Sequence, residues 1–230
     1  MSDVDLGAEF SFLARVVRHD LREPLRAVQG FSRVVAADYA NVLDDRALDR
    51  LRRVADAGAR LDQLVCQLAA YLEARILEPR LESIDGSELV DNVARDLREL
   101  CEQRSARLDV APDLPRLRVD REWATRALSN LVQNAIVFGA KEAPRVVVSA
   151  LDDGPGLRIG DDGEGFAADP ETLFPLFRRG VGREVPGVGA GLTIARAVAR
   201  SHGGDVWVQS SGSAGSVLAI SFAEPEERVR

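Results

Sequence analysis

The strongest constraint on the fold is a pair of long helical patterns in the first third of the chain. From about residue 6 to residue 37, apolar residues recur three or four positions apart, which predicts one long amphipathic helix. The same spacing returns from about residue 45 to residue 76 and predicts a second helix. Asp44 and Asp45 suit its beginning, because carboxylates accept hydrogen bonds from free helix amides, and Pro79 follows its end.

Two such helices joined by a short turn form a hairpin, and a single hairpin buries its apolar stripes only in part. A second copy would cover the remainder and complete a four-helix bundle. We therefore expect residues 1–78 to form an all-α helical hairpin. We also expect a homodimer, held together by a dimeric four-helix bundle.

After residue 80 the pattern changes to alternating strands and helices. Strands are predicted at Leu81–Ile84, Arg107–Val110, Arg116–Val119, Arg145–Leu151, Leu157–Gly160, Asp205–Gln209 and Ser216–Phe222. Helices are predicted at Ser87–Gln103, Glu122–Val137 and Leu192–Ser201. This mixture lacks regular βαβ units and predicts an α+β two-layer sandwich over residues 79–230. A stretch rich in Gly, Pro and Arg, residues 174–188, predicts a mobile loop or lid, and residues 224–230 are expected to fray.

Charge and composition exclude several classes of protein. The net charge of −7 and the pI near 5.0 argue against nucleic-acid binding. The sequence has no apolar run near the roughly 20 residues that cross a membrane, and its start does not resemble a secretion signal. Cys66 and Cys101 show neither disulfide nor metal-ligand spacing and are expected to be packing residues. We therefore expect a cytoplasmic protein without membrane insertion.

One of the two histidines, His19, lies in the sequence RHDLREPLR within the first predicted helix. On spacing alone, it would be a solvated residue of the helix surface. Pro24 is unusual inside a helix, because it removes a backbone hydrogen bond and bends the axis, so it indicates that the local shape matters. The segment from His19 to Leu25 resembles the H-box in the dimerisation domain of sensor histidine kinases.

The resemblance implies that His19 is the phosphoacceptor and that Asp20 is the catalytic base. A neutral imidazole can offer one nitrogen to the γ-phosphorus of ATP while a carboxylate holds the proton on the other. Adjacent residues on a helix point in different directions, so geometry supports Asp20 less than the resemblance does. Glu23 shares a face with His19, where many relatives carry a Thr or Asn that positions water for dephosphorylation of the partner. We therefore predict weak phosphatase activity.

Residues 130–135, NLVQNA, resemble the N-box of the GHKL ATP-binding fold of histidine kinases, gyrase-type topoisomerases and certain chaperones. Their spacing places Asn130 and Asn134 on one helix face, although an isolated pair would be read as exposed polar residues. The resemblance implies that Asn134 binds Mg²⁺ through its amide oxygen, with Asn130 in support. Many relatives carry Lys or Arg where this chain has Val137, a loss expected to weaken ATP binding by about 1 kcal/mol or more. Phe138 is expected to pack by the nucleotide.

Two glycine-rich motifs follow. Residues 161–166, DDGEGF, match the DxGxG motif of the same fold. The match implies that Asp161 accepts a hydrogen bond from the adenine amino group, while Gly163 and Gly165 let the backbone approach the nucleotide. The sequence GVGAGL opens a predicted helix, and its amides are expected to face phosphate at Gly187, Gly189, Gly191 and Leu192. The GxGxG spacing and late position exclude a dinucleotide-binding fingerprint, which needs GxGxxG after the first strand.

Residues 173–179, LFPLFRR, resemble the F-box that begins the lid. Phe174 and Phe177 are expected to anchor that lid in the core. Arg179, with Arg178 and Arg183 as alternates, is expected to meet phosphate charge. His202 is followed by two glycines, which is typical of a helix end, and it is expected to be structural.

Five motifs in the family's order, over residues 8–223, imply a hairpin for dimerisation and histidine phosphotransfer (1–78) and an ATP-binding catalytic domain (79–230). The implied function is that of a protein histidine kinase of a two-component system, which uses ATP and Mg²⁺. It would phosphorylate its own His19 and pass the phosphate to an aspartate of a response regulator receiver domain. Because 18 residues precede His19, a separate sensor protein or the sensor domain of a longer receptor is expected to supply the signal.

Two alternatives stay open. Val137 favours a histidine phosphotransfer or scaffold protein whose ATP site is degenerate. A GHKL ATPase that uses nucleotide for clamp motion is a third interpretation, but it leaves the H-box hairpin unexplained.

Overall fold

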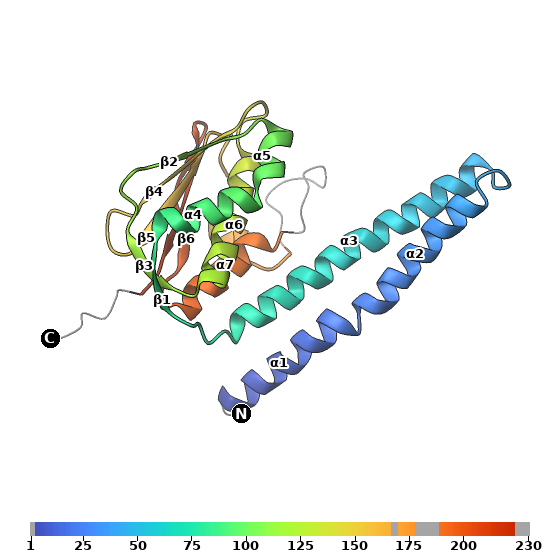
Figure 1. The fold of residues 1–230 in the computed structure, drawn as a ribbon, viewed down its shortest axis with the longest axis horizontal. Helices are drawn as coiled ribbons and strands as arrows, with labels where there is room; N and C mark the ends of the chain where they lie inside the picture. The colour runs from blue at the N-terminus through green and yellow to red at the C-terminus, as the bar shows by residue number, and fades with distance from the viewer. Residues whose placement is uncertain (1–2, 167–169, 178–188, 224–230) are drawn as a thin grey trace. The chain divides into compact units, whose positions relative to one another are not determined.

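The computed structural model describes residues 3–166, 170–177 and 189–223. The chain divides into two compact units, Met1–Ile76 and Leu77–Arg230 (Figure 1). Most of the predicted lid, residues 178–188, and all of the predicted frayed tail, residues 224–230, lie outside the described residues.

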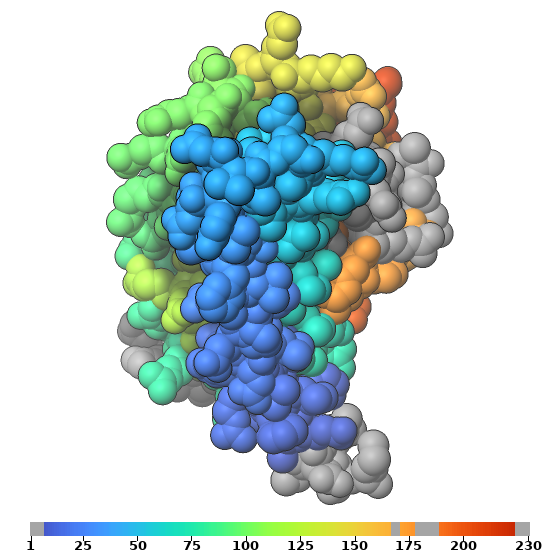
Figure 2. All heavy atoms as spheres, turned by 90° about the vertical axis from the view of Figure 1, so that its right-hand side faces the viewer, coloured from blue at the N-terminus to red at the C-terminus, as the bar shows by residue number. Residues whose placement is uncertain are grey.

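The first unit is a helical hairpin in which α1 (Asp3–His19) and α2 (Arg22–Asp38) form one arm and α3 (Asp45–Arg75) the other. The Asp44 side chain caps α3 by accepting a hydrogen bond from the Ala47 amide at 2.7 Å, as its position in the sequence predicts. The arms run antiparallel (Figure 1), and their side chains meet along the hairpin in the space-filling view (Figure 2). Their shared core consists of Ala14, Val17, Val65, Ala69 and Leu72, with Phe10, Leu25 and Leu68 packed against it.

The first arm is broken, so the prediction of one continuous helix is wrong at Asp20 and Leu21. The break follows from Pro24, which has no N–H to donate to the carbonyl four residues earlier and whose ring crowds that carbonyl. Leu21 instead directs its amide to Val16, which also accepts from Asp20, at distances of 3.3 and 2.9 Å. His19 is therefore the last residue of α1, directly before the break.

The second unit is built on a five-stranded sheet in the order β2-β4-β5-β7-β6, in which only β2 and β4 are parallel. The strands of this sheet are β2 (Arg107–Val110), β4 (Arg145–Ala150), β5 (Gly156–Asp161), β6 (Val206–Gly212) and β7 (Gly215–Ser221). A separate antiparallel pair consists of β1 (Glu82–Asp85) and β3 (Arg116–Val119). The helices are α4 (Gly86–Asp96), α5 (Arg98–Arg104), α6 (Arg121–Phe138) and α7 (Gly191–Ser201), with a short 3₁₀ turn, η1 (Pro170–Leu173).

Helices α4, α6 and α7 lie on one face of the large sheet, which confirms the predicted two-layer α+β sandwich (Figure 1). The core between the layers contains fully buried side chains from both, including Leu89, Leu128, Leu131, Ile136, Leu157, Ile159, Ile194, Leu218 and Ile220. The helix predicted at 87–103 is two helices, because Leu97 leaves helical geometry with φ −99° and ψ 7°. Among the described residues, each helix is too short or too polar to cross a membrane.

Candidate functional site

Asp161 ends β5 with its carboxylate half-buried and anchored on one side. Its Oδ1 accepts hydrogen bonds from the amides of Gly163 at 2.9 Å and Ser216 at 3.2 Å. Within the described part of the chain, Oδ2 has no hydrogen-bond partner, so this oxygen can accept from a ligand. Burial raises the pKa of Asp161; the two amide donors act against this shift, and the charge of Asp162 adds to it.

Asp162 is structural in this arrangement, although the sequence gives no signal that separates it from its neighbour. Its two oxygens accept hydrogen bonds from the amides of Ala140 and Arg145, both at 3.0 Å. These contacts tie the end of β5 to the loop that follows α6. The two adjacent carboxylates therefore differ in role. Asp161 has an oxygen without a partner among the described residues, whereas both oxygens of Asp162 bind the loop.

The glycines around Asp161 are required by the protein's own backbone. A Cβ on Gly163 would lie 2.1 Å from the carbonyl oxygen of Phe138, and one on Gly165, where φ is +74°, would lie 2.5 Å from that of Gly212. Gly215, at the start of β7, has φ +120° and would place a Cβ 1.9 Å from the carbonyl oxygen of Asp161. The loop after β5 thus passes tightly between the end of α6 and the turn between β6 and β7.

Helix α6 carries both asparagines of the predicted site. Asp120 caps its start by accepting from the Trp123 amide at 3.2 Å, which fixes where the helix begins. Asn130 and Asn134 are both half-buried. Asn130 lies beside the start of α7, because a Cβ on Gly191 would be 3.5 Å from its Oδ1. The structure therefore brings together the N-box and the end of the glycine-rich motif.

The beginning of α7 has the form of an anion-binding helix end. Residue 190 occupies the N-cap position, and its side chain does not cap the first amides of the helix. Gly189, with φ +75°, leads into this turn, and Gly191 and Leu192 are its first residues. The predicted phosphate residues Arg179 and Gly187 lie outside the described residues, as do Arg178 and Arg183.

At the other end of α6, Phe138 is the last helical residue and is 37% exposed. Val137, where a basic residue was expected from the family pattern, is half-buried. Among the described residues, no group of three or more His, Cys, Asp or Glu side chains is suited to hold a metal ion. Magnesium in nucleotide sites takes few protein ligands and completes its shell with phosphate and water, so a single amide such as Asn134 fits that mode.

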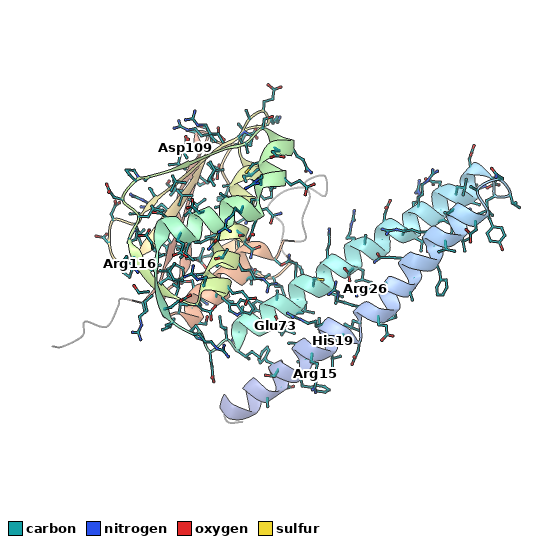
Figure 3. All side chains as sticks on the ribbon, viewed as in Figure 1. Arg15, His19, Arg26, Glu73, Asp109 and Arg116 are labelled. Carbon is teal, nitrogen blue, oxygen red and sulfur yellow. The ribbon has the colours of Figure 1, made fainter. Side chains whose placement is uncertain are left out.

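His19 is exposed at the end of α1, and two ion pairs join the arms of the hairpin near it. Arg18 pairs with Glu73, and Arg22 pairs with Asp62 at 2.9 Å. The hydrogen bond from Arg22 lowers the pKa of the Asp62 carboxyl. Figure 3 shows His19 between Arg15 and Arg26 along the first arm, with Glu73 on the facing α3.

Asp20 and Glu23 are also exposed, one in the break and the other in the first turn of α2. Among the described residues, no hydrogen bond connects Asp20 to His19. The base role of Asp20 therefore stays a prediction that rests on the family resemblance.

His202 has a role within the protein core. Its ring is buried, its Nε2 accepts from the Asp120 amide at 3.0 Å, and its Nδ1 lies 2.7 Å from the carbonyl oxygen of Val198. Nδ1 therefore carries the proton and donates it, so the imidazole is neutral. The edge of the Phe222 ring meets it at a centroid distance of 5.8 Å. His202 thus joins the start of α6 to the end of α7, in line with the structural role expected from the sequence.

Comparisons with known proteins show what this arrangement is similar to. Residues 119–226 match the family described as histidine kinase-, DNA gyrase B-, and HSP90-like ATPase. The methanogenesis regulatory histidine kinase FilI of Methanothrix harundinacea is 29% identical over 224 residues, which cover 95% of this chain and 25% of that protein. The chain spans less than half the length of the curated relatives it matches.

Two solved structures share the fold. Full-length ShkA in complex with AMPPNP superposes with a TM-score of 0.64 and 22% identity, covering 93% of this chain and 46% of that one. Histidine kinase ThkA in complex with the response regulator protein TrrA gives a TM-score of 0.62 at 21% identity, covering 95% of this chain and 62% of that one. At these identities the likeness concerns the fold, and both units of the chain fall within it.

Proposed function

We propose that the chain is a sensor histidine kinase, and that it transfers the γ-phosphate of ATP to His19 and then to an aspartate of a response regulator. The observation that carries the proposal is the pairing, in one chain, of an exposed histidine at a helix break with an ATPase-type site. In that site, one carboxylate oxygen of Asp161 has no partner among the described residues, and the start of α7, which its N-cap side chain does not cap, lies beside Asn130.

In the proposed nucleotide site, Oδ2 of Asp161 accepts from the adenine amino group, because it is the carboxylate oxygen that has no hydrogen-bond partner among the described residues. The first amides of α7 meet phosphate oxygens, which the positive end of the helix favours. Asn134 would hold Mg²⁺, with Asn130 one helical turn before it. When bound, the ion would neutralise phosphate charge and orient the phosphates.

The transfer step requires a neutral imidazole on His19. A ring nitrogen forms a bond to the γ-phosphorus while the bond from that phosphorus to the bridging oxygen of ADP breaks. Asp20 accepts a hydrogen bond from the remaining N–H of the ring and so stabilises the positive charge that develops on the imidazole. The exposure of His19 allows both the ATP-bound unit and a receiver domain to approach it in turn.

A homodimer is part of the proposal, and exposed apolar side chains on the hairpin support it. Phe31 is 72% exposed and Val28 50% exposed. Val54 and Leu61 are seven residues apart on α3, a spacing that keeps them on one face. We expect light scattering to give twice the chain mass of 25.0 kDa. Phe31→Glu should yield monomers, whereas Val42→Glu, in the turn between the arms, should leave the dimer intact; monomeric wild-type protein would contradict this.

Glu23 sets a further expectation, that the chain dephosphorylates its partner poorly. A carboxylate one turn from His19 repels an incoming aspartyl phosphate and cannot donate a hydrogen bond to position water as Thr or Asn does. Glu23→Thr should therefore increase phosphatase activity toward a phosphorylated response regulator. Efficient phosphatase activity in the wild type that is lost in Glu23→Ala would reverse this assignment.

The alternative is a phosphotransfer or scaffold protein with a degenerate ATP site, and Val137 is the observation that favours it. Incubation with γ-labelled ATP and Mg²⁺ separates the two functions. A kinase takes up acid-labile, alkali-stable label in the wild type and none in His19→Gln. Because His202 remains in that variant, it serves as an internal control for histidine labelling elsewhere. Unlabelled wild-type protein that nevertheless binds ATP would eliminate the kinase and leave the scaffold.

A further inference from the structure

Arg196, in the middle of α7, contacts three other parts of the second unit. Its Nε lies 2.8 Å from Oδ1 of Asp205, directly before β6, and its Nη1 lies 2.9 Å from Oε2 of Glu171 in η1. The guanidinium carbon is 4.2 Å from the ring centroid of Phe174, within cation–π range. The Arg196 side chain is only 16% exposed, whereas its partners Asp205 and Glu171 are 38% and 67% exposed, so water screens the Glu171 pair more than the Asp205 pair.

The contacts of Arg196 belong to a larger set that joins α7 to the segment 171–174. Thr193, almost one turn earlier on α7, donates its hydroxyl hydrogen to the carbonyl oxygen of Phe174. Asp205 is the partner of Arg196 directly before β6. Burial would raise the pKa of its carboxyl, but hydrogen bonds from Arg196 and Arg200 lower that pKa to about 2. Asp205 is therefore charged under ordinary conditions and remains a constant partner.

The apolar packing of α7 alone fixes the position of this helix along its axis only weakly. The residues that it buries are Ile194, Ala195, Ala197, Val198 and Ala199. Three of these five are alanines, which form shallow ridges and resist sliding of one helix along another only weakly. The axial position of α7 therefore depends strongly on its directional polar contacts, and among the described residues Arg196 supplies four such hydrogen bonds, two to Asp205 and two to Glu171.

We propose that Arg196 is a positioning residue for nucleotide binding, which keeps the first turn of α7 in place beside Asn130. The inference rests on the proposed ATP site. The favourable field of a helix N-terminus falls off within its first turn, and small displacements of binding groups have large effects. A shift of α7 would therefore affect the phosphate end of the nucleotide, while Asp161, on β5, would still hold the adenine end.

The test compares three variants of the full chain: Arg196→Met, Arg196→Lys and the control Arg200→Met. Arg200 lies one turn further along α7 and also pairs with Asp205, at 3.2 Å. Among the described residues, it contacts neither η1 nor Phe174. Calorimetry measures the affinity for AMPPNP with Mg²⁺, and an NMR titration measures the affinity for adenosine, which has no phosphates.

We expect Arg196→Met to weaken AMPPNP binding about tenfold or more while adenosine binding stays within about twofold of the wild type. Arg196→Lys should fall between, since it keeps the charge but loses the planar fork and the stacking. Arg200→Met should bind both ligands like the wild type.

Equal loss of AMPPNP and adenosine in Arg196→Met would indicate general damage to the domain and overturn the positioning role. Unchanged AMPPNP binding in a variant with a lower unfolding temperature would do the same, because it would reduce Arg196 to a stabilising residue. Wild-type protein that binds neither ligand would instead refute the ATP site itself, and the inference with it.

Discussion

Replacing Asp161 with Asn should weaken ATP binding while it changes the stability of the folded protein little. In the native protein, Oδ1 accepts from the amides of Gly163 and Ser216. Both donors are N–H groups, so the amide oxygen of an asparagine must occupy the Oδ1 position to satisfy them. The new NH₂ group then takes the place of Oδ2. Burial raises the pKa of Asp161, which means that the folded protein disfavours its charge. A neutral side chain in the same position should change the free energy of unfolding by less than about 1 kcal/mol.

Binding responds differently, because the substitution puts a donor where the adenine amino group also donates. A hydrogen bond to a charged group contributes about 1.5–3 kcal/mol, which corresponds to roughly 10- to 150-fold in affinity. The NH₂ group can instead donate to the carbonyl that guanine carries at the corresponding ring position. Asp161→Asn should therefore bind ATP much more weakly and bind GTP no worse than the wild type does.

Calorimetric titrations with ATP and GTP in the presence of Mg²⁺, together with thermal unfolding, test both parts. Asp162→Asn is the matched control, because among the described residues that carboxylate accepts from the amides of Ala140 and Arg145 alone. It should lower stability more than ATP affinity. An Asp161→Asn protein that unfolds at the wild-type temperature and binds ATP with wild-type affinity would refute the assignment of Asp161 to adenine.

Three further predictions concern the same domain. Gly215→Ala should destabilise it by about 2 kcal/mol or more, since φ is +120° and a Cβ would lie 1.9 Å from a backbone oxygen. Gly212→Ala should not destabilise it, because the space around that Cβ is open. Urea unfolding measures the free energy of unfolding of both variants. Burial lowers the pKa of His202, so its contribution to stability is complete above about pH 6.5 and decreases as the pH falls; pH-dependent unfolding should show this loss, and His202→Gln should remove it. Val137→Arg should increase ATP affinity about fivefold by supplying charge near the phosphates, and unchanged affinity in calorimetry would place Val137 away from them.

The sequence predicts the helices and strands of this chain well because their patterns are local, and it fails where the cause is tertiary. Spacing alone predicts both arms of the hairpin, and the roles of Asp161 and Asn130 are predictions from the resemblance. The role of Arg196 has no local signal, since its partners Glu171 and Asp205 are 25 and 9 residues away in sequence. The sequence likewise does not show why residue 215 is a glycine, because the requirement comes from the close contact between the β6–β7 turn and the end of β5. Contacts between distant segments determine both cases, and periodicity carries no information about them.

The helix break beside His19 leads to a last prediction. Pro24 cannot donate to the carbonyl of Asp20, and this missing bond ends α1 at His19. Pro24→Ala restores the donor, so the two helices can merge; the hairpin should gain about 1–3 kcal/mol in stability, less if the break persists. The gain should appear as higher helix content by circular dichroism and a higher unfolding temperature. If the break gives the imidazole the freedom to meet a phosphate, labelling of His19 from ATP should slow while ATP affinity stays unchanged. A continuous, more stable helix that is labelled at the wild-type rate would show that the break plays no part in the transfer.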